Sequence, residues 1–535
     1  MNAQPLLDAA GEQALDVVWL TDALRPASEY GVRPFADWRP FAPGEEAAAQ
    51  RRAQQVADCA AAFDEERLDA IRDAMRAAPD ARGAIARASM GEVLADADFL
   101  ELQRFCDAAG RVDEFIGTAI GSRPIVTTEV RGLSQALEPG RTGTHAFYLA
   151  DAFDAALAAA RSELKGAQAG FDASRARAVA EVAKRLNRDA VSSDEFIVMR
   201  ADLTAGVPAG VRVLREAPTY FLCALEFDDA SLGALARRDA AADAVASAEE
   251  SVRARLSDAV RRAAAHLDAA AAAFGDLDVL IAAARFARKH RCRVARIVDE
   301  PSLAFAGGRF LPLAIELARE GRTFAPITIA LHDVAVLTGP NMGGKSVCLR
   351  TCGFVALCAA LGLPVPADDA STSLFREIAW LGIGTDQNQP GSLLSSFANE
   401  VVRLRDVLER GARRLLVLVD EFARTTTPLE GKALLIALLR RLRDLGACGL
   451  AATHLSGVPG EAGSRHFAVR GVRGIPRPPS TGDLNQALAA LAASMDYTIV
   501  EVGKDAATGA DAIALASLLG LDDELVDTAR RYLQA

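Results

Sequence analysis

Apolar residues change their spacing near Val294, and this change separates two kinds of structure. Before it they recur mostly at the spacing of amphipathic helices, in alanine-rich stretches that favour helix. From Val294 to about Gly471, short apolar runs alternate with helical patterns, which is typical of a parallel sheet covered by helices. We therefore expect an α/β domain preceded by a largely α-helical region.

Upstream of Val294 the pattern predicts mostly helix. Helices are expected over residues 47–63 and 67–76, and one or two more over 151–186. Residues 234–291 contain one glycine, Gly275, and no proline, and this length suits two long helices.

Short β-branched and aromatic runs predict a few strands inside the helical region. One is Ile125–Thr128. Three more, at Phe196–Met199, Val211–Leu214 and Tyr220–Leu222, would form a small β insertion.

Charge gives an ambiguous indication about nucleic acid. The formal charge of −11 and the pI of about 5.3 count against tight non-specific binding, because such proteins usually carry a basic surplus. A local basic run between Arg285 and Arg296 could still contact phosphates, or it could be the solvated end of a helix. Its members are Arg285, Arg288, Lys289, Arg291, Arg293 and Arg296.

Cysteine usage and hydropathy indicate the compartment. The 8 cysteines show no zinc-ligand spacing and fit reduced thiols. No apolar run reaches the roughly 18 residues needed to cross a bilayer, and the N-terminus lacks the pattern of a signal peptide. We expect a cytoplasmic protein with no membrane partner.

One segment fits the phosphate-binding pattern GxxxxGK[ST], the Walker A motif or P-loop, in full. It follows the apolar strand Asp333–Thr338 and precedes a helix expected to start near Val347. Its residues are Gly339, Pro340, Asn341, Met342, Gly343, Gly344, Lys345 and Ser346. Glycines let the backbone N–H groups point at phosphates, Lys345 reaches the β- and γ-phosphates, and Ser346 ligates Mg²⁺. The motif predicts ATP and Mg²⁺ as ligands.

Two further strand ends carry polar residues that suit ATP hydrolysis. The apolar run Leu415–Val419 delivers Asp420, a Mg²⁺ ligand, and Glu421, which would polarise the attacking water. The run ending at Thr453 delivers His454, which would contact the γ-phosphate or the water. We therefore predict Glu421 and His454 as catalytic residues and Ser346 and Asp420 as metal ligands.

Together these residues resemble the MutS family of ABC-type ATPases. The resemblance rests on Thr338–Ser346, on Asp420–Arg424 with Glu430-Gly431, on Ala452–His454, and on Ser395–Glu400, which is similar to the signature segment of the family. It implies a homodimer with two composite ATP sites, in which Ser395 and Ser396 help to complete the site of the partner. It also suggests Phe324 as an adenine-stacking residue, with core packing as the alternative.

The resemblance organises the chain into four segments. They are an N-terminal helical region at 1–120, a helical core and lever region with a small β insertion at 121–293, a MutS-like P-loop ATPase domain of ABC type at 294–475, and a C-terminal extension at 476–535 that completes it.

The sequence departs from the family in two places. Thr425-Thr426-Thr427-Pro428 stands where the family usually has Gly-Thr-Ser-Thr, and no convincing Phe-x-Glu mismatch wedge is found. Phe63-Asp64-Glu65 and Phe99-Leu100-Glu101 have the bare spacing but lie in helical surroundings.

Two functions therefore stay open. The first is a DNA-associated ATPase, related to mismatch repair proteins, whose ATP-driven dimer closure clamps or releases DNA. Arg253, Arg255, Arg261 and Arg262 would add to its basic channel. The alternative is an ATP-dependent remodelling factor for a protein client, for example a cobalamin-dependent aminomutase.

Overall fold

The computed structural model describes residues 6–121, 124–143, 146–191, 195–203, 206–340, 344–382, 396–409, 414–424, 426–472, 494–503, 513, 516–517 and 521–534. Contacts divide the chain into two compact units. Unit 1 comprises residues 1–76, 114–123 and 274–535, and unit 2 comprises residues 77–113 and 124–273. The four contiguous segments predicted from the sequence are a different kind of division and stay a prediction.

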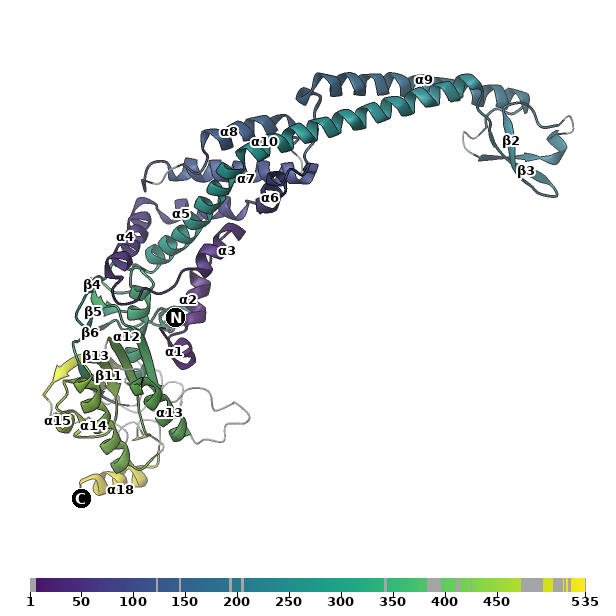
Figure 1. Ribbon diagram of the computed structural model, residues 1–535. Coiled ribbons are helices and arrows are strands. Elements are labelled where there is room, and N and C mark those ends of the chain that lie inside the picture. Colours follow the sequence, from purple (N-terminus) through teal and green to yellow (C-terminus); the bar gives the residue numbers. More distant parts are fainter. Residues whose placement is uncertain are drawn as a thin grey trace. The chain divides into compact units, whose positions relative to one another are not determined.

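Unit 2 is built mainly from helices. They are α6 (Arg82–Ser89), most of α7 (Asp96–Ile116), α8 (Thr128–Leu137), α9 (Ala155–Arg185), most of α10 (Asp229–Lys289) and the short 3-10 helices η1 (Glu138–Gly140), η2 (Asp151–Phe153) and η3 (Arg200–Leu203). Helix α9 runs beside α10 (Figure 1), where Arg161 pairs with Glu249 at 2.8 Å and the buried hydroxyls of Ser174 and Ser231 lie 2.9 Å apart.

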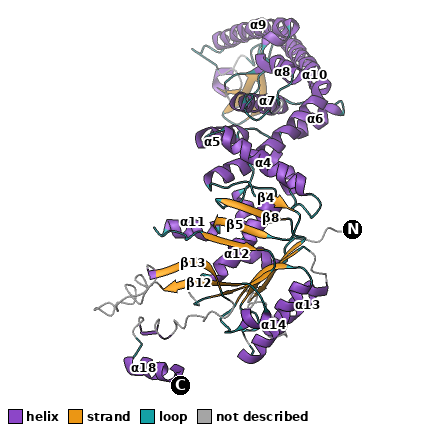
Figure 2. Cartoon of the chain, turned by 90° about the vertical axis from the view of Figure 1, so that its left-hand side faces the viewer, coloured by secondary structure: helices purple, strands orange, loops and turns teal. Residues whose placement is uncertain are grey.

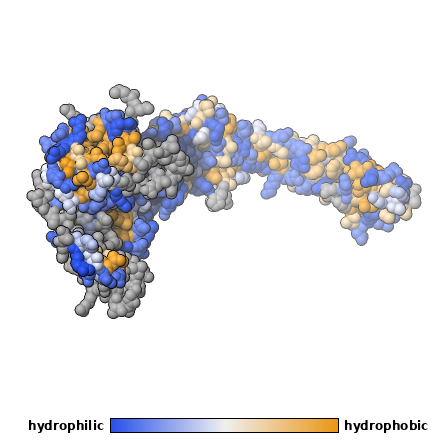
Figure 3. Space-filling view, turned by 90° about the horizontal axis from the view of Figure 1, so that it is seen from below, coloured by the Kyte–Doolittle hydropathy of each residue, from blue (hydrophilic) through white to orange (hydrophobic). Residues whose placement is uncertain are grey.

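The small β insertion of unit 2 is confirmed. It is an antiparallel sheet of order β1-β3-β2, formed by β1 (Glu195–Met199), β2 (Val211–Glu216) and β3 (Tyr220–Leu225). Val198 and Cys223 are fully buried in its small core, whereas Ile197 and Met199 are about half exposed. Over α9 and α10 the visible surface mixes hydrophilic and apolar residues (Figure 3), as expected of an exposed helix pair.

Two elements of the helical region differ from the prediction. One continuous helix, the 61-residue α10 (Asp229–Lys289), stands in place of the two predicted over 234–291. The helix continues through Gly275. A Cβ at this position would lie 2.4 Å from the carbonyl oxygen of Tyr30, so glycine is needed there for the close approach of the two backbones. Ile125–Thr128 is not a strand, since Thr127 caps α8 by accepting a hydrogen bond from the backbone N–H of Val130.

Unit 1 begins with helices and continues into two sheets (Figure 2). The helices are α1 (Ala9–Ala14), α2 (Val17–Ala23), α3 (Glu29–Ala36), α4 (Glu46–Ala62) and α5 (Glu65–Arg76). A four-stranded sheet of order β4-β8-β5-β6 follows, formed by β4 (Arg296–Val298), β8 (Asp369–Ser373), β5 (Leu303–Gly308) and β6 (Ile327–Leu331).

The second sheet has the order β13-β12-β7-β11-β10-β9. Neighbouring strands from β12 to β9 are parallel, and β13 lies antiparallel on the β12 edge. The strands are β7 (Val334–Thr338), β9 (Glu377–Gly382), β10 (Leu415–Asp420), β11 (Cys448–Ala452), β12 (His466–Val472) and β13 (Met495–Val502). This sheet confirms the α/β class predicted for the region after Val294.

Helices cover this sheet and position its strand ends. Among those in contact with it are α12 (Lys345–Ala360), α13 (Ser396–Glu409), α14 (Pro428–Asp444) and α15 (Val458–Ala462). Helix α11 (Leu311–Arg319) lies beside the four-stranded sheet (Figure 2), and α18 (Asp523–Gln534) follows β13 in the chain. Val417 and Val419 of β10 pack with Leu439 of α14 in one core cluster. Leu418, whose side chain alternates to the other face, meets α12 at Gly353. Among the described helices, none combines the length and the apolar composition of a membrane span.

Candidate nucleotide-binding site

The predicted P-loop lies between the central strand β7 and helix α12, as the motif requires. Gly339 follows β7 with a φ of 148°, and a Cβ there would meet Cβ of Val469 at 2.9 Å. Gly344 begins α12 with a φ of 78° and no side-chain cap. The first amides of α12 are therefore available to an anion. Asn341, Met342 and Gly343 lie outside the described residues.

Lys345 is held inside the loop by its own backbone. Its Nζ donates to the carbonyl oxygens of Gly339 at 2.8 Å and Pro340 at 3.1 Å, and the side chain is only 4% exposed. Burial lowers the pKa of the Lys345 ammonium, and the nearby carboxylates Glu421 and Asp420 act in the opposite direction. The position suits an ammonium that exchanges loop carbonyls for phosphate oxygens.

Ser346, in the first turn of α12, contacts Asp420 at the end of β10. The Ser346 Oγ donates to Asp420 Oδ1 at 3.1 Å. Burial raises the pKa of the Asp420 carboxyl, whereas the bond from Ser346 lowers it. A hydroxyl and a carboxylate oxygen side by side fit the oxygen preference of Mg²⁺.

Glu421 occupies a constrained turn directly after β10. Its φ is 53°, in the left-handed region that non-glycine residues rarely adopt, and its N–H donates to the carbonyl of Ala452 at 3.1 Å. Oε1 lies 3.8 Å from Lys345 Nζ and 3.8 Å from Nδ1 of His454, which follows β11 and is half exposed. The structure therefore brings Lys345, Ser346, Asp420, Glu421 and His454 together at one edge of the parallel sheet.

Three other predicted residues are not joined to this cluster by any described contact. Phe324 is half-buried in the segment between α11 and β6, and adenine stacking stays a prediction. Ser395 lies outside the described residues, as does the side chain of Ser396, the first residue of α13. Completion of a partner site by these serines also stays a prediction.

Glu400 is a residue of the site region whose role the sequence reasoning missed. Its Oε2 accepts a hydrogen bond from the backbone N–H of Ala423 at 3.0 Å, two residues after Glu421. The side chain is buried, and Oε1 has no hydrogen-bond partner among the described residues. The signal was present, since Phe397, Glu400 and Leu404 share one helical face, which places a carboxylate on an apolar side.

We predict that Glu400→Gln changes how stability depends on pH. Burial raises the pKa of the Glu400 carboxyl in the fold, and the bond from Ala423 only partly offsets this. A raised carboxyl pKa makes the folded state bind more protons, so stability is lost as pH rises from the ordinary glutamate range through the folded pKa. In chemical denaturation between pH 4 and pH 7, the free energy of unfolding of the variant should rise relative to that of the wild type as pH increases.

Glu400→Ala is the companion variant. It leaves the buried N–H of Ala423 without its acceptor and should cost about 1–3 kcal/mol at every pH. If the stability difference between Glu400→Gln and the wild type does not change with pH, the carboxylate is not titrating in the buried position.

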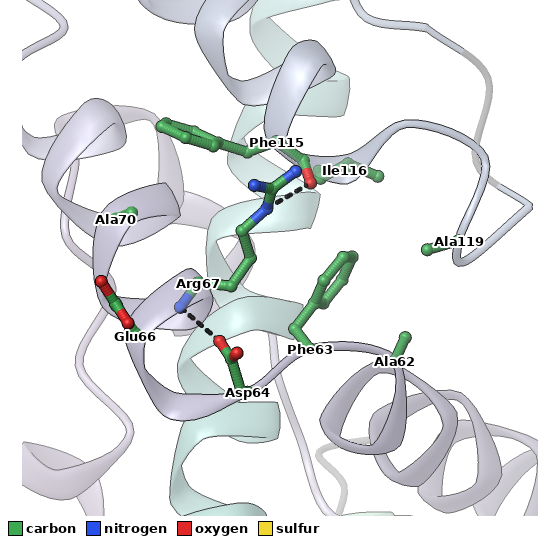
Figure 4. A pocket seen from close by; sticks show the side chains of 9 residues that line it. All are labelled: Ala62, Phe63, Asp64, Glu66, Arg67, Ala70, Phe115, Ile116 and Ala119. Atoms are coloured by element: carbon green, nitrogen blue, oxygen red, sulfur yellow. Dashed lines mark hydrogen bonds between the residues drawn. The ribbon is translucent and has the colours of Figure 1, made fainter.

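The phenyl rings of both Phe-x-Glu sequences are buried. Phe99 is fully buried and packs on Phe147 with ring centroids 5.4 Å apart. Phe63 is 6% exposed and lines a hollow in unit 1 (Figure 4). There Asp64 Oδ1 accepts from the Arg67 N–H at 2.8 Å, which gives that carboxylate a helix-capping role.

Several arginines of the predicted basic channel are paired with acids. Within unit 2, Arg253 bonds Asp96 at 2.8 Å and Arg255 bonds Asp154 at 2.9 Å. Arg261 and Arg262 both bond Asp258. Within unit 1, Arg285 bonds Asp69 at 2.6 Å. These pairs reduce the positive charge that such residues can offer to phosphates.

Similarity to known proteins extends over part of the chain. Residues 335–535 match the family model of MutS domain V. The chain is 32% identical over 286 residues to Endonuclease MutS2 of Pelotomaculum thermopropionicum, which covers 53% of this chain and 33% of the relative. It is 35% identical over 184 residues to Endonuclease MutS2 of Clostridium botulinum, 34% of this chain and 22% of the relative. The matches span a third or less of the relatives' own length.

The fold and the cluster define an α/β domain with a glycine-lined loop between a central strand and a helix. Its match to the family model of MutS domain V and its similarity to MutS2 proteins show that residues 335–535 are similar to the ATPase domain of the MutS family.

Proposed function

We propose that the chain is an ATP-hydrolysing motor of the MutS family that acts on DNA. The observation that carries the proposal is the meeting of Lys345, Ser346, Asp420, Glu421 and His454 at the edge of the parallel sheet, inside the region that matches MutS domain V. Open α/β sheets bind their ligands at this edge.

Each residue of the cluster has a chemical part in the proposal. Lys345 supplies positive charge to the phosphates, and the N-terminus of α12 supplies the positive end of the helix dipole. Glu421 orients and polarises the attacking water, and His454 contacts that water or the γ-phosphate. Ser346 and Asp420 would hold Mg²⁺, which neutralises charge on the phosphate oxygens when bound.

Dimer closure around composite sites is the finer part of the proposal. Nucleotide held at Gly344–Ser346 of one copy would meet Ser395 and Ser396 of a second copy. The signature-segment helix α13 is joined to the turn after Glu421 by the bond from Ala423 to Glu400. That bond gives a physical link between the dimer-facing segment and the hydrolytic residue.

The DNA partner rests on the relatives. The printed name Endonuclease MutS2 describes enzymes that cut nucleic acid. The matched segments cover a third or less of those proteins, so cutting is not carried over to this chain. The proposal also leaves out mismatch reading, since Phe63 and Phe99 are buried. No observation favours the protein-client alternative.

A salt series tests the DNA part. ATP turnover should rise or fall when duplex DNA is added, and DNA binding should weaken steeply as salt increases, because phosphate contacts release counterions. Matched, mismatched and branched duplexes should be compared with and without ATP. Turnover that ignores every DNA, from protein that binds none of them at low salt, would remove DNA from the proposal and leave the ATPase part intact.

A further inference from the structure

A second hollow lies in unit 1 between the C-terminal end of α10 and one face of α11, the helix on the flank of the four-stranded sheet in Figure 2. Its volume is about 550 Å³. The polar part of its lining is cationic, and its apolar floor includes Leu311 and Ile315. The cations are Lys289, Arg291, Arg309 and Arg319.

These four cations differ from their neighbours in having no acidic partner. Within the described part of the chain, no acidic residue lines the hollow and none forms an ion pair with the four. Nearby arginines behave differently, since Arg285 pairs with Asp69 and Arg322 pairs with Glu320. Four cations around one hollow without counter-charge create a positive potential that favours an anion.

Arg309 gives an independent indication. Its Nη2 donates to the carbonyl oxygen of Arg291 at 3.1 Å, which fixes the guanidinium beside the hollow. Its Nε is buried and has no hydrogen-bond partner among the described residues. Because the Nε is shielded from solvent, a ligand in the hollow would reach this guanidinium through its exposed Nη groups.

His290 supports the same assignment. Its ring belongs to the lining and packs on Phe286, with centroids 5.0 Å apart. Burial, together with the charges of Lys289, Arg309 and Arg285, lowers the pKa of His290 to about 4. The imidazole is therefore neutral near pH 7 and offers an aromatic wall beside the cations.

Helix ends explain part of this cluster. Lys289 and Arg319 each lie in the last turn of a helix, where a cation stabilises the negative end of the dipole. Arg309 lies before α11, where that account does not apply, and Arg291 lies beyond the end of α10. Helix dipoles therefore account for two of the four cations, and Arg309 also bonds the carbonyl oxygen of Arg291.

We propose that this hollow binds a phosphate group carried by an organic ligand. The four cations would contact the phosphate, and the apolar floor would contact the rest of the ligand. The size is within the range of small-molecule sites. The site lies outside the P-loop cluster and goes beyond the function proposed above. The phosphate could belong to a free organic phosphate or to the backbone of DNA, and the experiment separates these sources.

Arg319→Glu and Arg322→Glu form a matched pair for the test. Both arginines are exposed and lie three positions apart, and both substitutions replace a positive charge by a negative one. Only Arg319 lines the hollow. Binding is measured in full-length chain that also carries Lys345→Ala, so that the P-loop does not contribute. One arm titrates adenosine 5′-monophosphate by calorimetry, and the other titrates a labelled short duplex DNA by anisotropy. Lys289→Glu serves as a second pocket variant.

We expect one arm to show binding that Arg319→Glu and Lys289→Glu each weaken by about tenfold or more, while Arg322→Glu changes it little. A response in the nucleotide arm assigns a free organic phosphate, and a response in the DNA arm assigns the backbone. Absence of binding in both arms, or equal losses in Arg319→Glu and Arg322→Glu, would overturn the proposal. ATP turnover with Lys345 intact should survive Arg319→Glu, so failure of this site and failure of the ATPase are distinguishable.

Discussion

Glu421→Gln should lower kcat for ATP hydrolysis by about 10²–10⁴-fold while ATP binding is retained. The substitution keeps the size of the side chain but removes the carboxylate that polarises the attacking water. Glu421 is held for this task by the left-handed turn after β10 and by the cationic and imidazole groups near its Oε1. The measurement is phosphate release under single-turnover conditions, with nucleotide affinity determined separately.

The matched control for that variant is Glu409→Gln, at the exposed end of α13. It makes the same chemical change outside the cluster and should leave kcat unchanged. A Glu421→Gln protein that hydrolyses ATP at the wild-type rate would take Glu421 out of the mechanism.

Lys345→Ala should weaken ATP binding by about 10–100-fold, since one charge-assisted hydrogen bond is worth about 1.5–3 kcal/mol. The substitution removes the buried ammonium that lies between the loop carbonyls and the two carboxylates Asp420 and Glu421. Equilibrium titration with a fluorescent ATP analogue measures the effect.

Lys432→Ala is the control for this second variant. Lys432 pairs with Glu461 at 2.7 Å on the outside of the domain, so removing its ammonium should not alter ATP affinity. Equal affinities of the wild type and Lys345→Ala for ATP, in protein with unchanged circular dichroism, would contradict the P-loop assignment.

The α/β part of the fold was predictable because its signals are local. Buried parallel strands appear as short apolar runs, and β7, β10 and β11 lie where those runs predicted them. The rule that such strands present their carboxyl ends at one edge then places Asp420, Glu421 and His454 near Lys345.

The helical region was less predictable because its decisive contacts are remote in sequence. The length of 234–291 suggested two helices, and nothing local indicated that Gly275 meets Tyr30, a residue far away in the sequence. Thr127 belongs to a β-branched run but acts as a helix cap, since its hydroxyl competes locally for the N–H of Val130.

Ion pairs between residues far apart in the sequence could not be predicted either. Arg253 looks like a free cation in the sequence, but its partner Asp96 is 157 residues away. Arg309 is the opposite case, because nothing in its local pattern indicates a buried Nε without a partner. Charge patterns along a chain report where cations are, whereas the availability of a cation depends on tertiary contacts.

The most direct test of the account is the rate of phosphate release from ATP by the purified full chain, with Mg²⁺ present and with Mg²⁺ removed by EDTA. The account predicts steady release that requires Mg²⁺, because Ser346 and Asp420 are placed to hold it, and that falls to background in Lys345→Ala. Release at the same rate in EDTA and in Lys345→Ala, or no release by folded wild-type protein with or without DNA, would contradict it.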